Sequence, residues 1–154
     1  MFLLLIVIVF LLDQGSKLMV QAAMYHGESI PVFPPVFYIT YVLNPGAAFG
    51  LLAHQDMLFI SVTLLLVAGV LLAYKRLAAG RVVVKAGLGL VVGGALGNLV
   101  DRLRHGMVVD FLDFRVWPVF NLADSAIVAG ACLLAWEILK SVDDKDQKRE
   151  SKEI

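Results

Sequence analysis

The sequence predicts an all-α membrane protein, a bundle of four transmembrane helices with a small β-rich element outside the membrane. First, 60% of its 154 residues are hydrophobic, against roughly 45–50% in soluble domains. Second, four apolar segments approach the roughly 20 residues that a helix needs to cross a bilayer. Third, β-branched and aromatic runs beside turn residues lie in the connections between these segments.

We expect one integral membrane domain over residues 1–140, with helices at about 2–20, 57–74, 82–104 and 123–139. The first segment is as apolar as a secretory signal peptide. However, it lacks a basic N-terminal region and continues into Asp13 and Lys17 where a cleavage site would be expected. We therefore interpret it as a helix. These two residues are four apart on one helix face, so they can neutralise each other.

The third helix carries a row of small residues spaced four apart, along which a neighbouring helix can approach closely. The row consists of Gly89, Gly93 and Gly97. The same spacing, in this row and a parallel one, leads to three polar residues at the outer end of the bundle. These are Asn98, Asp101 and Arg102. Helix packing is thus expected to fix the positions of these polar side chains.

Two external regions, at about 30–50 and 107–120, are expected to be β-rich. The run VFYITYVL in the first has strand composition and ends at the turn signal Asn44-Pro45-Gly46. The run MVVDFLDF in the second has similar composition, and alternation places Asp110 and Asp113 on opposite strand faces. The two runs can join in one small sheet at the membrane surface.

Lysine and arginine gather in the connection between the second and third helices and in the C-terminal tail. They are Lys75, Arg76, Arg81 and Lys85, then Lys140, Lys145, Lys148, Arg149 and Lys152. Because basic residues mark the cytoplasmic side of a membrane, we expect both termini in the cytoplasm and the β-rich regions outside. The tail, 141–154, mixes acids and bases with few apolar residues, so we expect it to be disordered.

The composition also argues against several classes of function. Thirteen basic and thirteen acidic residues give a net charge of zero, so no basic surface for nucleic acid is expected. The single cysteine, Cys132, excludes an intrachain disulfide and a cysteine-based metal cluster. The three histidines are scattered over external loops. We therefore expect no metal site and no cofactor.

The stretch from Gly93 to Ser125 holds the polar residues that need an explanation, because ionisable groups beside membrane segments are costly and often functional. Apolar neighbours around Asp110 would desolvate its carboxylate and raise its pKa. Asn121 is a plausible N-cap of the last helix, which places Asp124 at the third helical position, where the helix dipole favours the ionised form. Two carboxylates in such different settings suit acid–base hydrolysis of a peptide bond.

A purely structural interpretation of the same aspartates is equally open from spacing alone. Asp124 would then be a capping acid, and such caps stabilise a helix by about 0.5–1 kcal/mol. Asp110 would be one partner of a salt bridge to an arginine.

Five short motifs occur in order along the chain. They are DQGSK at 13–17, NPGAAFG at 44–50, GALGNLVDR at 94–102, VVDF at 108–111 and FNLADS at 120–125. With these motifs and the four-helix pattern, the chain resembles the signal peptidase II family, the bacterial membrane aspartyl proteases that process lipoproteins. The resemblance extends over almost the whole length.

The resemblance implies that Asp110 and Asp124 form a catalytic dyad. Nine further residues match the family's other motif positions and are expected to bind substrate or shape the site. They are Asp13, Lys17, Asn44, Gly46, Asn98, Asp101, Arg102, Asn121 and Ala123. For Asp13 and Lys17, anchoring the first helix beside the site is at least as good an interpretation as contact with substrate.

The implied reaction removes signal peptides from diacylglyceryl-modified prolipoproteins, with cleavage before the lipidated cysteine. The expected partners are these substrates and membrane lipids, with the enzyme a monomer, and water is the only co-reactant. The expected location is the bacterial cytoplasmic (inner) membrane, with the active site near the extracytoplasmic face. The alternative function is a small four-helix channel or transporter. That class would place acids near mid-membrane, whereas the second and third helices carry none there.

Overall fold

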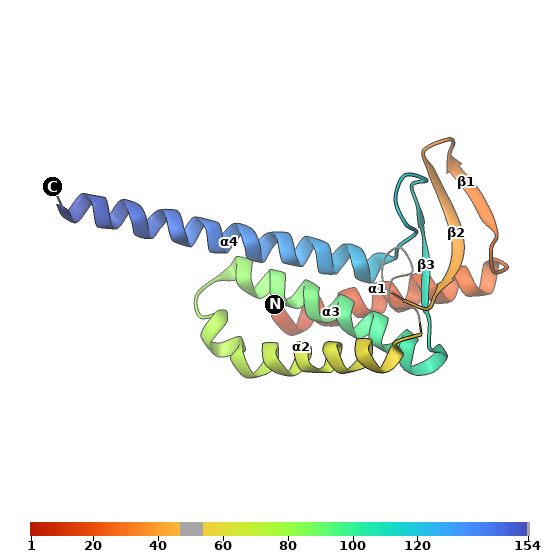
Figure 1. The fold of residues 1–154 in the computed structure, drawn as a ribbon, viewed down its shortest axis with the longest axis horizontal. Helices are drawn as coiled ribbons and strands as arrows, with labels where there is room; N and C mark the ends of the chain where they lie inside the picture. Colours follow the sequence, from red (N-terminus) through yellow and green to blue (C-terminus); the bar gives the residue numbers. More distant parts are fainter. Residues whose placement is uncertain (47–53, 154) are drawn as a thin grey trace.

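The computed structural model describes residues 1–46 and 54–153, with side chains up to Val142. Figure 1 shows four helices side by side, with a sheet across one end of the bundle. The helices are α1 (Phe2–Ala23), α2 (Asp56–Leu77), α3 (Val82–His105) and α4 (Leu122–Glu153), and the strands are β1 (Ser29–Phe33), β2 (Phe37–Asn44) and β3 (Val108–Asp113).

All four helices are long and apolar enough to cross a membrane, the fourth over Leu122–Val142. The predicted fold class, four membrane helices with a small β element, is therefore confirmed. Helix α3 is central and holds many buried residues, whereas no residue of α2 is buried. Because α3 packs on α1, α2 and α4, the polar residues at its end are held from several sides.

Glycines allow this close packing, as the sequence predicted. A Cβ atom on Gly89 or Gly93 would lie about 3 Å from Leu5 or Val9 of α1. On the other side of α3, a Cβ atom on Gly94 would collide with the backbone carbonyl of Ala123 in α4. The two small-residue rows of α3 therefore face different helices and bring both against it.

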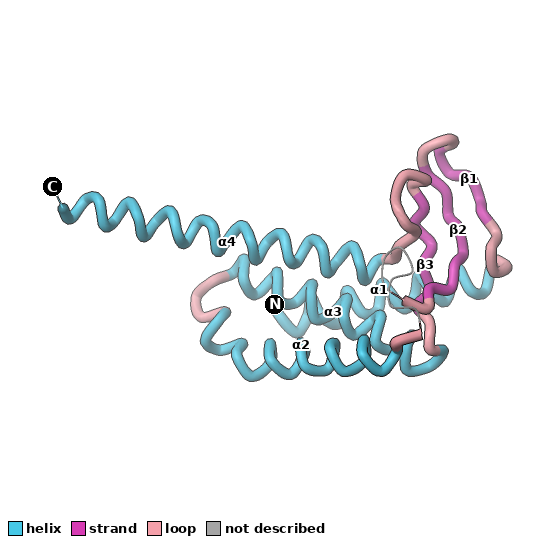
Figure 2. Tube along the Cα trace, in the orientation of Figure 1, coloured by secondary structure: helices cyan, strands magenta, loops and turns pink. Residues whose placement is uncertain are grey.

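The three strands form one antiparallel sheet in the order β1-β2-β3, which lies where α1 and α3 end and α4 begins (Figure 2). Strand β3 is the buried one, and Asp110 lies opposite Val42 of β2. Buried Phe111 packs with Val20 and Met24 at the end of α1. This apolar contact holds the sheet against the bundle and fixes the depth of β3 beside α3.

Helix α4 continues to Glu153, past the helix end at about residue 139 that the sequence predicted. The disorder expected for residues 141–154 stays a prediction. The tail contains neither glycine nor proline, and lysine, arginine, glutamine and glutamate all have high helix propensity. Acidic and basic residues also recur three or four apart, as between Asp144 and Lys148. Low hydrophobicity therefore did not prevent the helix from extending beyond its apolar part.

Residues 47–53 lie outside the described residues, and they include the second half of the motif at 44–50. Its first half is described, with Asn44 at the end of β2 and Gly46 two residues beyond. Of the β-rich region predicted up to residue 50, residues 47–50 therefore lie outside the described part of the chain.

Replacing Gly94 with alanine is expected to destabilise the protein, because the new methyl group meets backbone atoms that cannot rotate away. Overpacking of this kind typically costs about 1–3 kcal/mol. Thermal unfolding in detergent measures the effect. Gly69→Ala on α2 is the matched control, since nothing lies within 4 Å of its Cβ position. Equal melting temperatures for the two variants would contradict the packing described here.

Candidate active site

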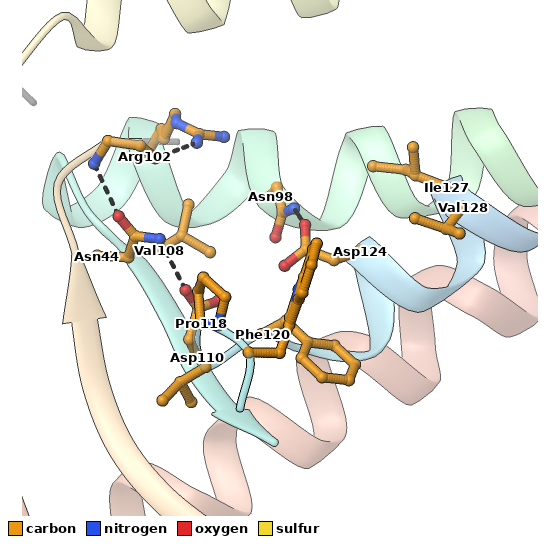
Figure 3. A pocket seen from close by; sticks show the side chains of 13 residues that line it. Asn44, Asn98, Arg102, Val108, Asp110, Pro118, Phe120, Asp124, Ile127 and Val128 are labelled. Carbon is orange, nitrogen blue, oxygen red and sulfur yellow. Dashed lines mark hydrogen bonds between the residues drawn. The ribbon is translucent and has the colours of Figure 1, made fainter. Parts of the chain in front are cut away.

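A cavity of about 380 Å³ lies between the sheet and the ends of α3 and α4. Figure 3 shows that Asp110 of β3 and Asp124 of α4 both face it, together with the amides of Asn44 and Asn98 and the side chain of Arg102. Apolar side chains from the segment between β3 and α4, and from α4 itself, form the rest of the lining. Two carboxylates thus meet in a cavity that is otherwise largely apolar.

Asp110 is only 2% exposed, and its two oxygens accept hydrogen bonds from different elements. Asn44 Nδ2 donates to Oδ2 at 2.9 Å and Asn121 Nδ2 donates to Oδ1 at 2.7 Å. Burial, followed by the negative charge of Asp124, raises the pKa of Asp110 to about 7. Among the described residues no arginine lies within salt-bridge distance of Asp110. The salt-bridge interpretation of this residue is therefore wrong.

Asp124 occupies the third position of α4 and takes part in a reciprocal cap with Asn121. The Asn121 side-chain oxygen accepts from the Asp124 backbone N–H at 2.9 Å, and Asp124 Oδ2 accepts from the Asn121 N–H at 3.3 Å. This is the capping arrangement that the sequence predicted. Oδ1 of Asp124 accepts from Asn98 Nδ2 at 2.8 Å. The cap thus orients the carboxylate toward the cavity, so capping does not exclude a catalytic role.

Lys17 lies behind the cavity, 2% exposed, with three acceptors around its ammonium group. Its Nζ is 2.9 Å from Asp13 and 2.9 Å from Asp101, and it donates to Asn98 Oδ1 at 2.8 Å. The three donors of the ammonium are therefore satisfied. The expected neutralisation of Asp13 by Lys17 is present, and Asp101 of α3 joins it.

Asp13 has a second role that links α1 to α4. Its Oδ1 accepts from the backbone N–H of Ala123 at 3.0 Å, at the second position of α4. Both residues are fully buried. Because the first N–H groups of a helix have no partner within it, a carboxylate from α1 fixes where α4 begins, and therefore where Asp124 lies.

Asp101 makes the corresponding link to the strand. Its Oδ2 accepts from the backbone N–H of Val109 at 3.2 Å, next to Asp110. Its Oδ1 accepts from Gln14 Nε2 at 3.0 Å. Lys17 thus supports Asp124 through Asn98 and supports the backbone beside Asp110 through Asp101.

Arg102 completes the cavity from the side of α2. Its guanidinium donates to the Gly46 carbonyl at 3.2 Å and lies 4.5 Å over the ring of Phe59. Gly46 N–H in turn donates to Asn44 Oδ1 at 2.9 Å, which orients the amide that bonds Asp110. Arg102 therefore provides a positive charge at the cavity while bracing the end of β2.

All eleven residues singled out from the sequence belong to one connected group. Six line the cavity: Asn44, Gly46, Asn98, Arg102, Asp110 and Asp124. Five lie behind it: Asp13, Lys17, Asp101, Asn121 and Ala123. The anchoring interpretation of Asp13 and Lys17 therefore agrees with their positions.

Sequence reasoning missed several residues of this site. Gln14 bridges α1 and α3, and its place inside the first motif was the available signal. Trp117 and Phe120 line the cavity, but an aromatic residue near a helix start does not reveal which side it faces. Asp113, predicted only to lie on the strand face opposite to Asp110, is buried, and it accepts from Thr40 and pairs with Arg115.

Among the described residues, no three His, Cys, Asp or Glu side chains are placed to hold a metal ion. The two cavity carboxylates are instead held by amide donors. Such a pair can exchange protons with a water molecule and a substrate carbonyl.

Comparison with known proteins agrees with this arrangement. Residues 5–140 match the family described as signal peptidase (SPase) II. The chain belongs to the signal peptidase II family. It is 61% identical to a lipoprotein signal peptidase of Pelotomaculum thermopropionicum, over 99% of this chain and 100% of the relative. A lipoprotein signal peptidase of Moorella thermoacetica is 53% identical, over 90% of this chain and 92% of the relative.

The fold is also that of solved structures. A bacterial membrane enzyme determined in meso at 2.3 Å superimposes with a TM-score of 0.90 at 32% identity, covering 94% of this chain and 90% of that one. A second such structure, at 1.9 Å, gives a TM-score of 0.84 at 32% identity, over 90% and 92% of the two chains. The arrangement of the helices and sheet is therefore shared with solved bacterial membrane enzymes.

Lys17→Met is expected to destabilise the protein by about 3–5 kcal/mol, because it leaves two buried carboxylates without their cation. Thermal or denaturant unfolding in detergent measures the loss. Lys75→Met, at an exposed position, should change stability by no more than about 0.5 kcal/mol. If the two variants unfolded alike, the buried ion pairs would not support the site.

Proposed function

We propose that this signal peptidase II cleaves the signal peptide from diacylglyceryl-modified prolipoproteins just before the lipidated cysteine, with Asp110 and Asp124 as the catalytic pair. The observation that carries the proposal is the meeting of two carboxylates, held by neutral amides, in one cavity at the end of a membrane bundle. The alternative function, a channel or transporter, does not explain why several amide hydrogen bonds hold these two carboxylates in one cavity.

The two settings suggest different roles. Asp110 has a pKa raised to about 7, so it retains a proton near neutrality and can donate it to the scissile carbonyl oxygen. Asp124 accepts hydrogen bonds from Asn98 and the Asn121 N–H, which orient its carboxylate to take a proton from water. The water oxygen then attacks the carbonyl carbon, and the resulting tetrahedral intermediate collapses by breaking the C–N bond. The leaving nitrogen takes the proton held by Asp124, and Asp110 takes back a proton from a hydroxyl of the intermediate, which gives the carboxylic acid product and restores both aspartates.

The other cavity residues act on geometry and charge. Asn98 and Asn121 orient the aspartates, and Arg102 offers a positive charge near both carboxylates and the developing oxyanion. Asp13, Lys17, Asp101 and Ala123 fix the elements that carry them. No metal or organic cofactor takes part in this scheme, and the chain acts as a monomer.

The protein spans a bacterial inner membrane, and we place its termini in the cytoplasm and the cavity near the outer face. The basic connection between α2 and α3 and the basic tail support this orientation. The sheet lies at the opposite end of the bundle from these basic segments (Figure 1), and residues of β2 and β3 line the cavity.

Asp110→Asn and Asp124→Asn are each expected to reduce cleavage by about 10²–10⁴-fold, because asparagine keeps the volume but cannot exchange a proton. The double variant should be little worse than either single one. The measurement is the cleavage rate on a lipid-modified prolipoprotein, with unfolding in detergent as the test of folding.

Asp113→Asn is the matched control on the same strand. It should remain active, because Asp113 bonds Thr40 and Arg115 rather than lining the cavity. A dyad variant that kept near-wild-type turnover, or lost activity only by unfolding, would rule out the aspartyl mechanism.

The pH dependence should follow the proton on Asp110. Since its pKa is raised to about 7, kcat/KM is expected to fall about tenfold per pH unit above that value. The stability of the folded protein should also decrease as the pH rises. The folded state keeps a proton that the unfolded chain loses near pH 4, so stability declines as pH rises from about 4 to 7. Measuring kcat/KM and unfolding over the same pH range separates the effect on catalysis from the effect on stability. If activity rose above pH 8, the assignment of Asp110 as proton donor and Asp124 as proton acceptor would be wrong.

The orientation has its own test. Cysteines introduced at Glu28 and Ala79, in a Cys132→Ala background, should react with a membrane-impermeant thiol reagent from outside and from the cytoplasm respectively. The opposite labelling pattern in intact cells would reverse the topology and move the cavity to the inner face.

A further inference from the structure

A second, apolar cleft of about 570 Å³ adjoins the cavity, beside the first turns of α4. Its lining consists of Phe114, Trp117, Phe120, Asp124, Ser125, Val128 and Ala129. Four of these residues, Trp117, Phe120, Asp124 and Val128, also line the first cavity. The cavity and the cleft therefore share a wall, and Asp124 belongs to both.

The cleft offers almost nothing to a polar ligand. Among the described residues that line it, the polar groups are the side chains of Asp124 and Ser125 and the indole N–H of Trp117, and Asp124 also lines the first cavity. The Ser125 hydroxyl already donates to the Asn121 carbonyl at 3.0 Å, and Asp124 is held by Asn98 and Asn121. The remaining lining is aromatic or aliphatic. An apolar occupant fits this chemistry.

Aromatic side chains and one face of α4 line the cleft. One wall is an aromatic row in which the Phe114 ring lies 4.8 Å from Phe37 and 5.9 Å from Phe120, so the sheet holds it in place. The floor is α4, where Val128 and Ala129 are exposed. The next helical turn adds Cys132, which is also exposed. This surface continues along the apolar part of α4 that can span the membrane. In a membrane, that part of the helix is surrounded by lipid acyl chains.

We infer that this cleft holds one acyl chain of the diacylglyceryl group on the substrate cysteine, an inference that rests on the proposed function. The acyl chain gains little by leaving lipid for the cleft, because hydrocarbon is as apolar as the side chains that replace it. The benefit is therefore positional. A chain laid along α4 sets the distance of the modified cysteine from Asp124 and holds the scissile bond in register with the dyad.

Filling the floor tests this role. Ala129→Phe should lower kcat/KM for a long-chain diacylglyceryl substrate by about 10- to 100-fold, the range expected when a reacting bond is misplaced by about 1 Å. Because register rather than affinity is lost, kcat should fall more than KM rises. The ratio of kcat/KM for long-chain over short-chain substrate should fall as well. Ala22→Phe, at an exposed alanine near the same end of α1, should leave that ratio unchanged.

A photoreactive diazirine in the substrate acyl chain locates the occupant directly. In the Asp110→Asn variant, which retains substrate, adducts are expected on Val128, Ala129 or Cys132. Excess unlabelled lipidated substrate should suppress them, whereas a signal peptide without lipid should not. A phospholipid with the same diazirine chain is the comparison. Equal, uncompeted labelling by the phospholipid would show a site for bulk lipid, and competition by the unlipidated peptide would show a site for a peptide side chain. Either result overturns the inference.

The proposed function can fail separately. If the wild-type protein cleaved neither substrate, the peptidase assignment would be wrong. If cleavage depended on Asp110 and Asp124 while Ala129→Phe kept the wild-type ratio between long-chain and short-chain substrates, only the acyl-chain site would be wrong.

Discussion

The buried ammonium group of Lys17 is the interaction on which the rest of the site depends. It joins α1 to α3 through Asp101 and Asn98, and it neutralises the carboxylate of Asp13 that caps α4. A buried ion pair contributes little net stability, since desolvation offsets most of the attraction, but removing one partner is costly. Its value here is geometric, because the same charge fixes both elements that carry the aspartates.

Lys17 supports both aspartates through other residues, without bonding either of them. Asn98 bonds both Lys17 and Asp124, and Asp101 bonds both Lys17 and the backbone N–H before Asp110. Asn98 and Asp101 fix the positions of the two aspartates, while the ammonium group itself stays out of contact with their carboxylates. An ammonium group in direct contact would hold a carboxylate permanently ionised, whereas amide donors leave it able to bind and release a proton. Neutral amides therefore contact the two carboxylates, and the ion pairs of Lys17 lie behind these amides. The carboxylates are held rigidly in this way and can still exchange protons.

The sequence predicted those parts that depend on local spacing. Helix positions followed from hydrophobicity, the close packing of α3 from its glycines, and the cap between Asn121 and Asp124 from three-residue spacing. It did not predict contacts between distant segments, such as Gln14 with Asp101 or Thr40 with Asp113, because these depend on how helices rotate about their axes. The length of α4 was missed because helix propensity in the tail outweighed its low hydrophobicity.

The position of the cavity between two unlike surroundings has a chemical consequence. On one side lie the amides and ion pairs that orient Asp110 and Asp124, and on the other lies the aromatic and aliphatic wall that continues along α4. A low-dielectric wall strengthens the charge interactions within the cavity, which contributes to the raised pKa of Asp110 through burial. The same wall suits a substrate whose reactive bond is joined to lipid, because the bond can meet the polar side while the lipid never leaves an apolar environment. In the proposed function, proton transfer and the holding of the lipid therefore meet at the boundary that Asp124 marks.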